Sequence, residues 1–231
     1  MTEKPTAIPQ PPGRLPEVLP ILPLFDAVLF PKMVLPLVVM QGESVKVVDE
    51  AMAKDRLIGL VVSKDRDQKA GTAKEHLSAV GTSALILKMA KTQDDRTQLL
   101  VQGLSRFRIL GFSEKKEFIQ ARVGPVSEVM RQDKETEALT ANIVSQFSRI
   151  VELSPGLPPE IAQMARSIQE PGTLADMVAS TINASLEEKQ GILEMQDIKQ
   201  RLTAVTRLVN HQAEILELGS KIQNQVKGDM D

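Results

Sequence analysis

The chain has 231 residues, of which 42% are hydrophobic and 25% are charged, and its formal net charge is -2 at pH 7. This length and apolar content predict one large or two small domains with a real core. Because Cys, Trp and Tyr are absent and only six Phe are present, the composition excludes a disulfide framework and argues against a nucleic-acid binder that stacks bases on aromatic rings.

Residues 1–14, MTEKPTAIPQPPGR, are rich in proline and contain no apolar run of signal-peptide length. We expect a flexible tail here, and no export signal. Farther along, the longest uninterrupted apolar runs stay far below the roughly 20 residues that a membrane helix needs. The sequence therefore predicts a cytoplasmic protein without a membrane partner.

The segment Leu19–Val39 is an apolar stretch interrupted by prolines at positions 20, 23, 31 and 36. Its residues favour extended structure, but proline cannot donate to a strand ladder. We therefore expect two edge strands joined by a turn near Asp26 and Pro31. Four apolar side chains crowd into this turn: Phe25, Leu29, Phe30 and Met33. They are candidates for promiscuous protein binding, to which a flexible Met is suited, although Leu29 and Phe30 could equally belong to the core.

Up to about residue 130, short runs of Val, Ile, Leu and Phe lie between Gly and Pro residues. This pattern predicts a β-rich unit. The predicted strands are 18–24, 34–40, 57–63, 80–90, 97–104, 107–112 and 118–129. One helix is expected at 44–54, with Ser44 as its cap and an apolar stripe at helical spacing. So many short strands predict a strongly bent sheet or small barrel.

After Met130 the apolar period changes from two to about 3.6, which predicts helices only. The first helix must end before Ser154–Pro159, and the two prolines there suit the start of the next one. Two capping boxes are expected, one at Thr173 with Asp176 and one at Ser185 with Glu188. The chain thus predicts an α+β fold in which a helical bundle, 131–231, follows the β-rich subdomain, 15–130.

The last predicted helix, 197–227, would be about 45 Å long. Leu208, Ile215 and Ile222 repeat at intervals of seven. One interpretation is that the first half of this helix packs on its own helical bundle. The other is that the second half leaves the bundle as a coiled-coil arm, with Leu218, Ile222 and Val226 facing another domain or subunit.

The sequence contains no Gly-rich phosphate loop, and none of its serines lies in a setting that marks a nucleophile. The two histidines, His76 and His211, lie far apart and have no partner at metal-ligand spacing. We therefore predict no catalytic residue, no cofactor and no metal site, and expect that the chain is not itself an enzyme.

Several segments together carry a family resemblance: Leu19–Val39, GTSALILKM from Gly81, LLVQGLSRFRI from Leu99, and the run from Glu170 to Val226 that ends in Leu-x-x-Lys-Ile. From about Leu15 to Lys227 the chain resembles the amino-terminal (LON) domain of Lon, the ATP-dependent protease. Two residues depart from the family pattern. Phe25 stands where a polar residue is common, and Lys32 stands where Gly is common.

The resemblance implies a β subdomain similar to the PUA-type barrel and a non-catalytic role in capturing unfolded, damaged or degron-bearing proteins. In Lon this region precedes an AAA+ ATPase module and a Ser-Lys protease module, and it supports assembly of a hexamer. We therefore expect an excised amino-terminal domain of a bacterial Lon. The alternative is a freestanding LON-domain protein that binds a partner or small ligand. Nucleic acid is not an expected partner of this chain, because its charge bias is weak.

Overall fold

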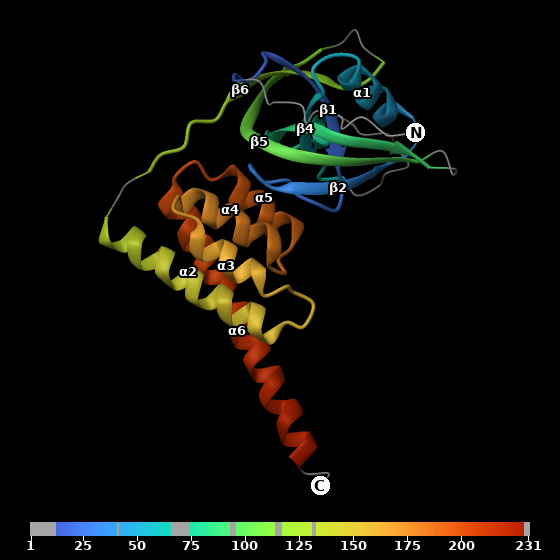
Figure 1. The fold of residues 1–231 in the computed structure, drawn as a ribbon. Coiled ribbons are helices and arrows are strands. Elements are labelled where there is room, and N and C mark those ends of the chain that lie inside the picture. The colour runs from blue at the N-terminus through green and yellow to red at the C-terminus, as the bar shows by residue number, and fades with distance from the viewer. Residues whose placement is uncertain are drawn as a thin grey trace, which may run out of the picture. The chain divides into compact units, whose positions relative to one another are not determined.

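The computed structural model describes residues 13–40, 42–65, 74–92, 96–113, 117–130 and 133–228 (Figure 1). The chain divides into two compact units, residues 1–126 and 127–231, and each is taken by itself below. Of the predicted tail, only Gly13 and Arg14 belong to the described residues.

In its described residues, the first unit is a six-stranded mixed sheet with one α-helix. Its elements are β1 (Val18–Leu24), β2 (Val34–Val39), α1 (Glu43–Met52), β3 (Leu57–Val62), the short 3-10 helix η2 (Lys74–His76), β4 (Val80–Lys91), β5 (Thr97–Phe112) and β6 (Gln120–Pro125). The strand order is β2-β5-β4-β3-β1-β6, and β5 also pairs with β6. This extra pairing closes five strands into a barrel and leaves β2 attached to β5 alone, so the predicted α+β class with a small barrel is confirmed.

The prediction that both proline-containing strands are sheet edges holds for β2 but is wrong for β1. The first half of β1, Val18–Pro20, pairs with β6, and the second half, Ile21–Leu24, pairs in parallel with β3. Each half of β1 therefore pairs with another strand on one side only, although β1 as a whole has neighbours on both sides. This arrangement accommodates Pro20 and Pro23, which cannot donate to a strand ladder.

β5 is one strand, whereas the sequence predicted two that break between Leu104 and Phe107. The ladder with β4 continues through the expected break, since Ser105 pairs with Ser83 and Arg106 with Thr82. Instead of a break, β5 has irregularities in its register with β4 and with β6. A bulge lets one strand turn from one side of a small barrel to another without a loop, so β5 can pair with β2 at one end and β6 at the other.

Two apolar clusters fill the first unit. One joins α1 to the sheet through buried Val47, Val48 and Ala51 together with Ile86, Leu99 and Val101. The other surrounds Phe107, which is completely buried. The apolar stripe of α1 therefore packs as predicted, but its N-cap is Gly42, with a φ of 112°, and not Ser44.

The described part of the second unit contains five helices. They are α2 (Lys134–Leu153), α3 (Glu160–Ser167), α4 (Pro171–Thr181), α5 (Leu186–Glu194) and α6 (Ile198–Gly228). α2 and α4 pack on α6. Side chains that are completely buried in this bundle include Phe147 of α2, Val178 of α4 and Leu202 of α6. The predicted succession of helices ending in a long one is confirmed.

The helix ends show which capping predictions hold. Ser185 and Glu188 form the predicted capping box, in which each side chain accepts a backbone N–H of the other. The predicted box at Thr173 does not form, because α4 begins two residues earlier at Pro171 and Thr173 donates to Glu170 instead. Asp176 lies inside the helix and is buried, next to Arg201 of α6.

Candidate functional site

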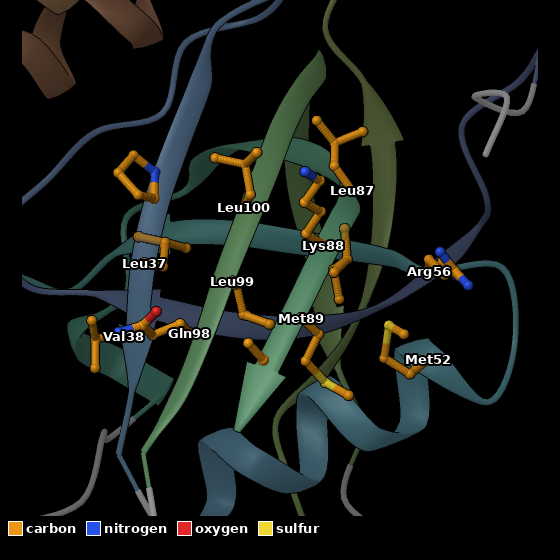
Figure 2. A pocket seen from close by; sticks show the side chains of 13 residues that line it. Leu37, Val38, Met52, Arg56, Leu87, Lys88, Met89, Gln98, Leu99 and Leu100 are labelled. Carbon is orange, nitrogen blue, oxygen red and sulfur yellow. The ribbon is translucent and has the colours of Figure 1, made fainter. Parts of the chain in front are cut away.

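A hollow of about 910 Å³ opens on the sheet of the first unit beside α1 (Figure 2). Three strands contribute a row of paired residues to it, Leu37 of β2, Leu99 of β5 and Met89 of β4. The pairing of β3 with β4 ends at Leu85. Past that point, no strand in the described part of the chain pairs with this side of β4 along Leu87–Ala90.

The floor of the hollow is core, whereas its walls are partly exposed. Ile86 and Leu99 are buried, while Leu37, Met52 and Met89 pack on the same apolar cluster and keep part of their surface accessible. Figure 2 shows Met89 reaching from β4 toward α1, on which Met52 lies. We call this hollow the methionine groove. Unbranched Met side chains adapt to differently shaped apolar partners.

The charged residues that line the methionine groove are both basic, Arg56 and Lys88. Arg56 has a φ of 61°, which is unusual for a residue with a side chain. Two backbone hydrogen bonds of 2.9 Å hold it between α1 and β4: its N–H donates to Ala51, and its carbonyl accepts from Ile86. Among the described residues, neither Arg56 nor Lys88 has a side-chain hydrogen bond or ion pair, so both charges are available to a ligand.

A second hollow, of about 610 Å³, lies along the same strand β2 and shares Pro36–Val38 with the methionine groove. Its lining includes Phe25 and the acidic residues Asp26 and Glu43. We call it the acidic hollow. The two hollows that meet at β2 therefore carry charges of opposite sign.

The structure places the four predicted substrate-binding residues in two different settings. Leu29 is 3% exposed and Phe30 is 0% exposed, so both are core residues. Phe25 and Met33 are half-buried, with Phe25 in the lining of the acidic hollow and Met33 against the α1 cluster. Substrate binding by this loop remains a prediction, and it now rests on Phe25 and Met33.

Hydrogen bonds to the barrel explain why the loop before β2 is held in place. The Thr82 hydroxyl donates to the Leu29 carbonyl at 2.6 Å, and Gly103 exchanges backbone hydrogen bonds with Lys32 and Met33. Lys32 has a φ of 65°. Glycine adopts this left-handed conformation more readily than a residue with a side chain does.

The predicted contact residues of α6 lie on its last turns. Leu218 is 60% exposed and Ile222 is 51% exposed, and Ile215 before them is 56% exposed. The side chain of Val226 lies outside the described residues. An interface through this face remains a prediction.

The histidines lie apart from both hollows. His76 Nδ1 lies 3.1 Å from Asp65 Oδ2 at a partly exposed position, and His211 is exposed on α6. Within the described ranges, no group of three or more His, Cys, Asp and Glu side chains is placed to hold a metal ion. In that same part of the chain, no helix is long and apolar enough to cross a membrane.

Residues 18–211 match the family described as the ATP-dependent protease La (LON) substrate-binding domain. The chain belongs to this family. It is 53% identical over 221 residues to the Lon protease of Syntrophus aciditrophicus (strain SB) and 50% identical over 218 residues to that of Desulfosudis oleivorans. Each match covers 94% of this chain, but only 28% and 27% of the respective relative. The LON chain thus spans about a quarter of the length of these relatives.

The fold agrees with that of a solved relative. The N-terminal domain of the Mycobacterium avium complex Lon protease superposes with a TM-score of 0.69, over 84% of this chain and 98% of that chain, at 21% identity. The sequence indicates this LON family, but the binding residues predicted from it do not include Leu37, Met52 and Met89. The two Met residues at the ends of a helix and a strand were the available signal, because such flexible side chains suit an adaptable apolar wall.

Proposed function

We propose that this LON domain captures unfolded, damaged or degron-bearing proteins and delivers them to ATPase and Ser-Lys protease modules of a Lon protease in the cytoplasm. The methionine groove is the proposed capture site, and it is the observation that carries the proposal. An unfolded protein differs from its folded form in exposing apolar side chains. A groove with adaptable walls binds such side chains without requiring one sequence.

The free energy of covering apolar surface also favours the methionine groove as the capture site. Leu37, Met52 and Met89 remain partly exposed although they pack on the core cluster. Covering apolar surface is worth about 25 cal/mol per Å², so an apolar segment seated here gains free energy from both surfaces. The partly exposed Phe25, in the lining of the acidic hollow, could extend the contact along β2.

Assembly is the second part of the proposed role. The exposed apolar residues of α6 repeat along one helix face, which supports association with another subunit and, in a full-length Lon, formation of a hexamer. The domain itself is proposed to bind without performing chemistry. The isolated chain should then neither hydrolyse ATP nor cleave casein.

Fluorescence anisotropy with labelled unfolded casein tests the capture site. Replacing Met52 and Met89 together by Ser should weaken binding several-fold, because it removes two apolar walls of the groove. Met164→Ser is the matched control, since Met164 is 56% exposed on α3 in the other unit. It should bind casein as the unmodified chain does.

A second double variant distinguishes the loop from the groove. If Phe25→Ser with Met33→Ser weakens binding while the Met52 and Met89 variant does not, the capture site lies at the loop. Circular dichroism melting of each variant identifies any loss that comes from unfolding. Equal casein affinity in all the folded variants would overturn the proposal.

A further inference from the structure

We propose that the methionine groove selects extended apolar segments that carry a carboxylate, and that Arg56 and Lys88 bind this carboxylate. The inference rests on the proposed capture function and adds the charge that the preferred substrate carries. The occupant is an unfolded stretch of protein with a bulky apolar side chain next to Asp or Glu.

Charge complementarity is the first argument. The lining of the groove contains Arg56 and Lys88 and no acidic residue. Neither cation has a side-chain partner within the described part of the chain. A carboxylate beside an apolar anchor would pair with them, whereas a lysine there would be repelled.

The backbone of Arg56 is the second argument. A left-handed conformation is costly for a residue with a side chain, and Gly or Asn would adopt it more readily. The chain nevertheless places an arginine here, and hydrogen bonds to Ala51 and Ile86 hold it at the edge of the groove. A guanidinium offers a fork of donors that matches the two oxygens of a carboxylate.

The open edge of β4 indicates an extended occupant. Since β3 pairs with β4 only up to Leu85, the edge along Leu87–Ala90 has no strand partner on that side among the described residues. Peptides commonly bind by adding a strand to such an edge. Successive side chains of a segment that binds in this way point to opposite faces of the sheet, as Met89 and Lys88 of β4 do. An apolar residue can therefore reach the Met89 wall while the acid next to it faces the cations.

The apolar side chains of the groove walls make nucleic acid or a small phosphate an unfavourable occupant. Leu37, Met52 and Met89 offer no hydrogen-bond donors, so a polyanion would cover them without gaining apolar contact. On the far side of β2, Asp26 and Glu43 would repel it. An apolar protein segment with a single acid matches both the walls and the two cations.

The test measures anisotropy of three short fluorescein-labelled peptides that share one apolar core flanked by Glu, Gln or Lys. The Glu peptide should bind the intact chain about two- to five-fold more tightly than the Gln peptide, and the Lys peptide should bind more weakly than both, as expected for partly exposed ion pairs. The preference should shrink at high salt, because exposed charges are screened.

Variants assign the preference to the two cations. Arg56→Asn suits the left-handed backbone, and together with Lys88→Gln it should bring the Glu and Gln peptides to equal affinity. Lys88→Glu should shift the preference toward the Lys peptide. Lys91→Gln, on the same strand but outside the groove lining, is the matched control and should keep the preference for Glu.

Equal affinity for the Glu and Gln peptides in the intact chain would overturn the inference. So would a preference for Glu that survives the Arg56→Asn and Lys88→Gln double variant. In both cases the Met52 and Met89 variant still decides the capture function separately, because it should weaken binding of all three peptides. If binding follows charge alone and is unaffected by these Met substitutions, the proposed capture site fails as well.

Discussion

The guanidinium of Arg201 lies 3.4 Å from the carboxylate of Asp176, and both side chains are almost completely buried between α6 and α4. Arg201 Nη2 also donates to the Met195 carbonyl at 2.7 Å and pairs with Glu128 at 2.8 Å. One side chain thus joins two helices, the turn before α6 and the segment that enters the helical unit. The nearby Gly172 leaves room for it, since a Cβ there would lie 3.3 Å from Nη1.

Arg201→Met should lower the free energy of unfolding by about 3–5 kcal/mol, because it leaves the buried Asp176 carboxylate without this cation. Urea unfolding followed by circular dichroism measures the loss. Replacing Asp176 by Leu in the same chain should recover part of it, since a buried pair can often be exchanged for apolar residues. Arg207→Met, at an exposed position of α6, is the control and should change stability little. An equally small effect of Arg201→Met would show that the pair is dispensable.

Gly103→Ala should destabilise the first unit by about 1–3 kcal/mol, the usual range for overpacking. A Cβ at this position would lie 2.3 Å from the Phe30 carbonyl oxygen, and backbone cannot move aside as a flexible side chain can. Gly111→Ala on the same strand is the control, because nothing lies within 4 Å of its Cβ position. Thermal melting of both variants gives the comparison. Equal melting temperatures would contradict the close packing of the loop on β5.

The sequence predicted the elements of the fold well where local chemistry decides them. Period-two runs marked the strands, and Ser185 with Glu188 marked a helix start that the structure confirms. The errors arose where tertiary pairing overrides local signals. Nothing local shows that β1 changes partner halfway, or that β5 passes through Ser105 without a break.

The site was harder to predict from the sequence than the fold was. Phe30 and Met33 belong to one short apolar turn, but only the folded barrel shows that Phe30 is fully buried and Met33 is not. Met52 and Met89 are 37 positions apart in the sequence, and they line one groove because both pack on the apolar cluster that joins α1 to the sheet. Such a site depends on contacts between distant segments, and periodicity within a segment does not report them.

Asp133 should make stability depend on pH in the acid range. It caps α2, and hydrogen bonds from the Thr136 N–H, the Lys199 ammonium and the Thr136 hydroxyl lower the pKa of its carboxyl to about 2. Because this folded-state pKa lies below the ordinary value of about 3.9, the ionised cap stabilises the fold above about pH 4. Its contribution is lost as the pH falls from about 4 toward 2.

Urea unfolding of the unmodified chain and of Asp133→Ala at several pH values tests this dependence. The difference between them should be largest near neutral pH and should narrow below about pH 4. Asp133→Asn keeps a capping oxygen without a titrating charge, so its difference from Asp133→Ala should stay nearly constant. A gap between the unmodified chain and Asp133→Ala that widens on acidification would contradict the assigned cap.

Truncation after Leu216 should remove self-association while leaving the fold intact. The exposed Leu218 and Ile222 would be lost, and covering such apolar side chains favours pairing between subunits. The cut also removes the ion pair of Arg149 with Glu217, but that pair is exposed and should contribute little. The melting temperature should therefore change only slightly. Sedimentation equilibrium should show weak, reversible association of the intact chain and a monomer after truncation. Met164→Ser, at a position of α3 that is 56% exposed, should keep the association. If truncation instead unfolds the helical unit, the last turns of α6 stabilise their own bundle and the proposed subunit contact is wrong.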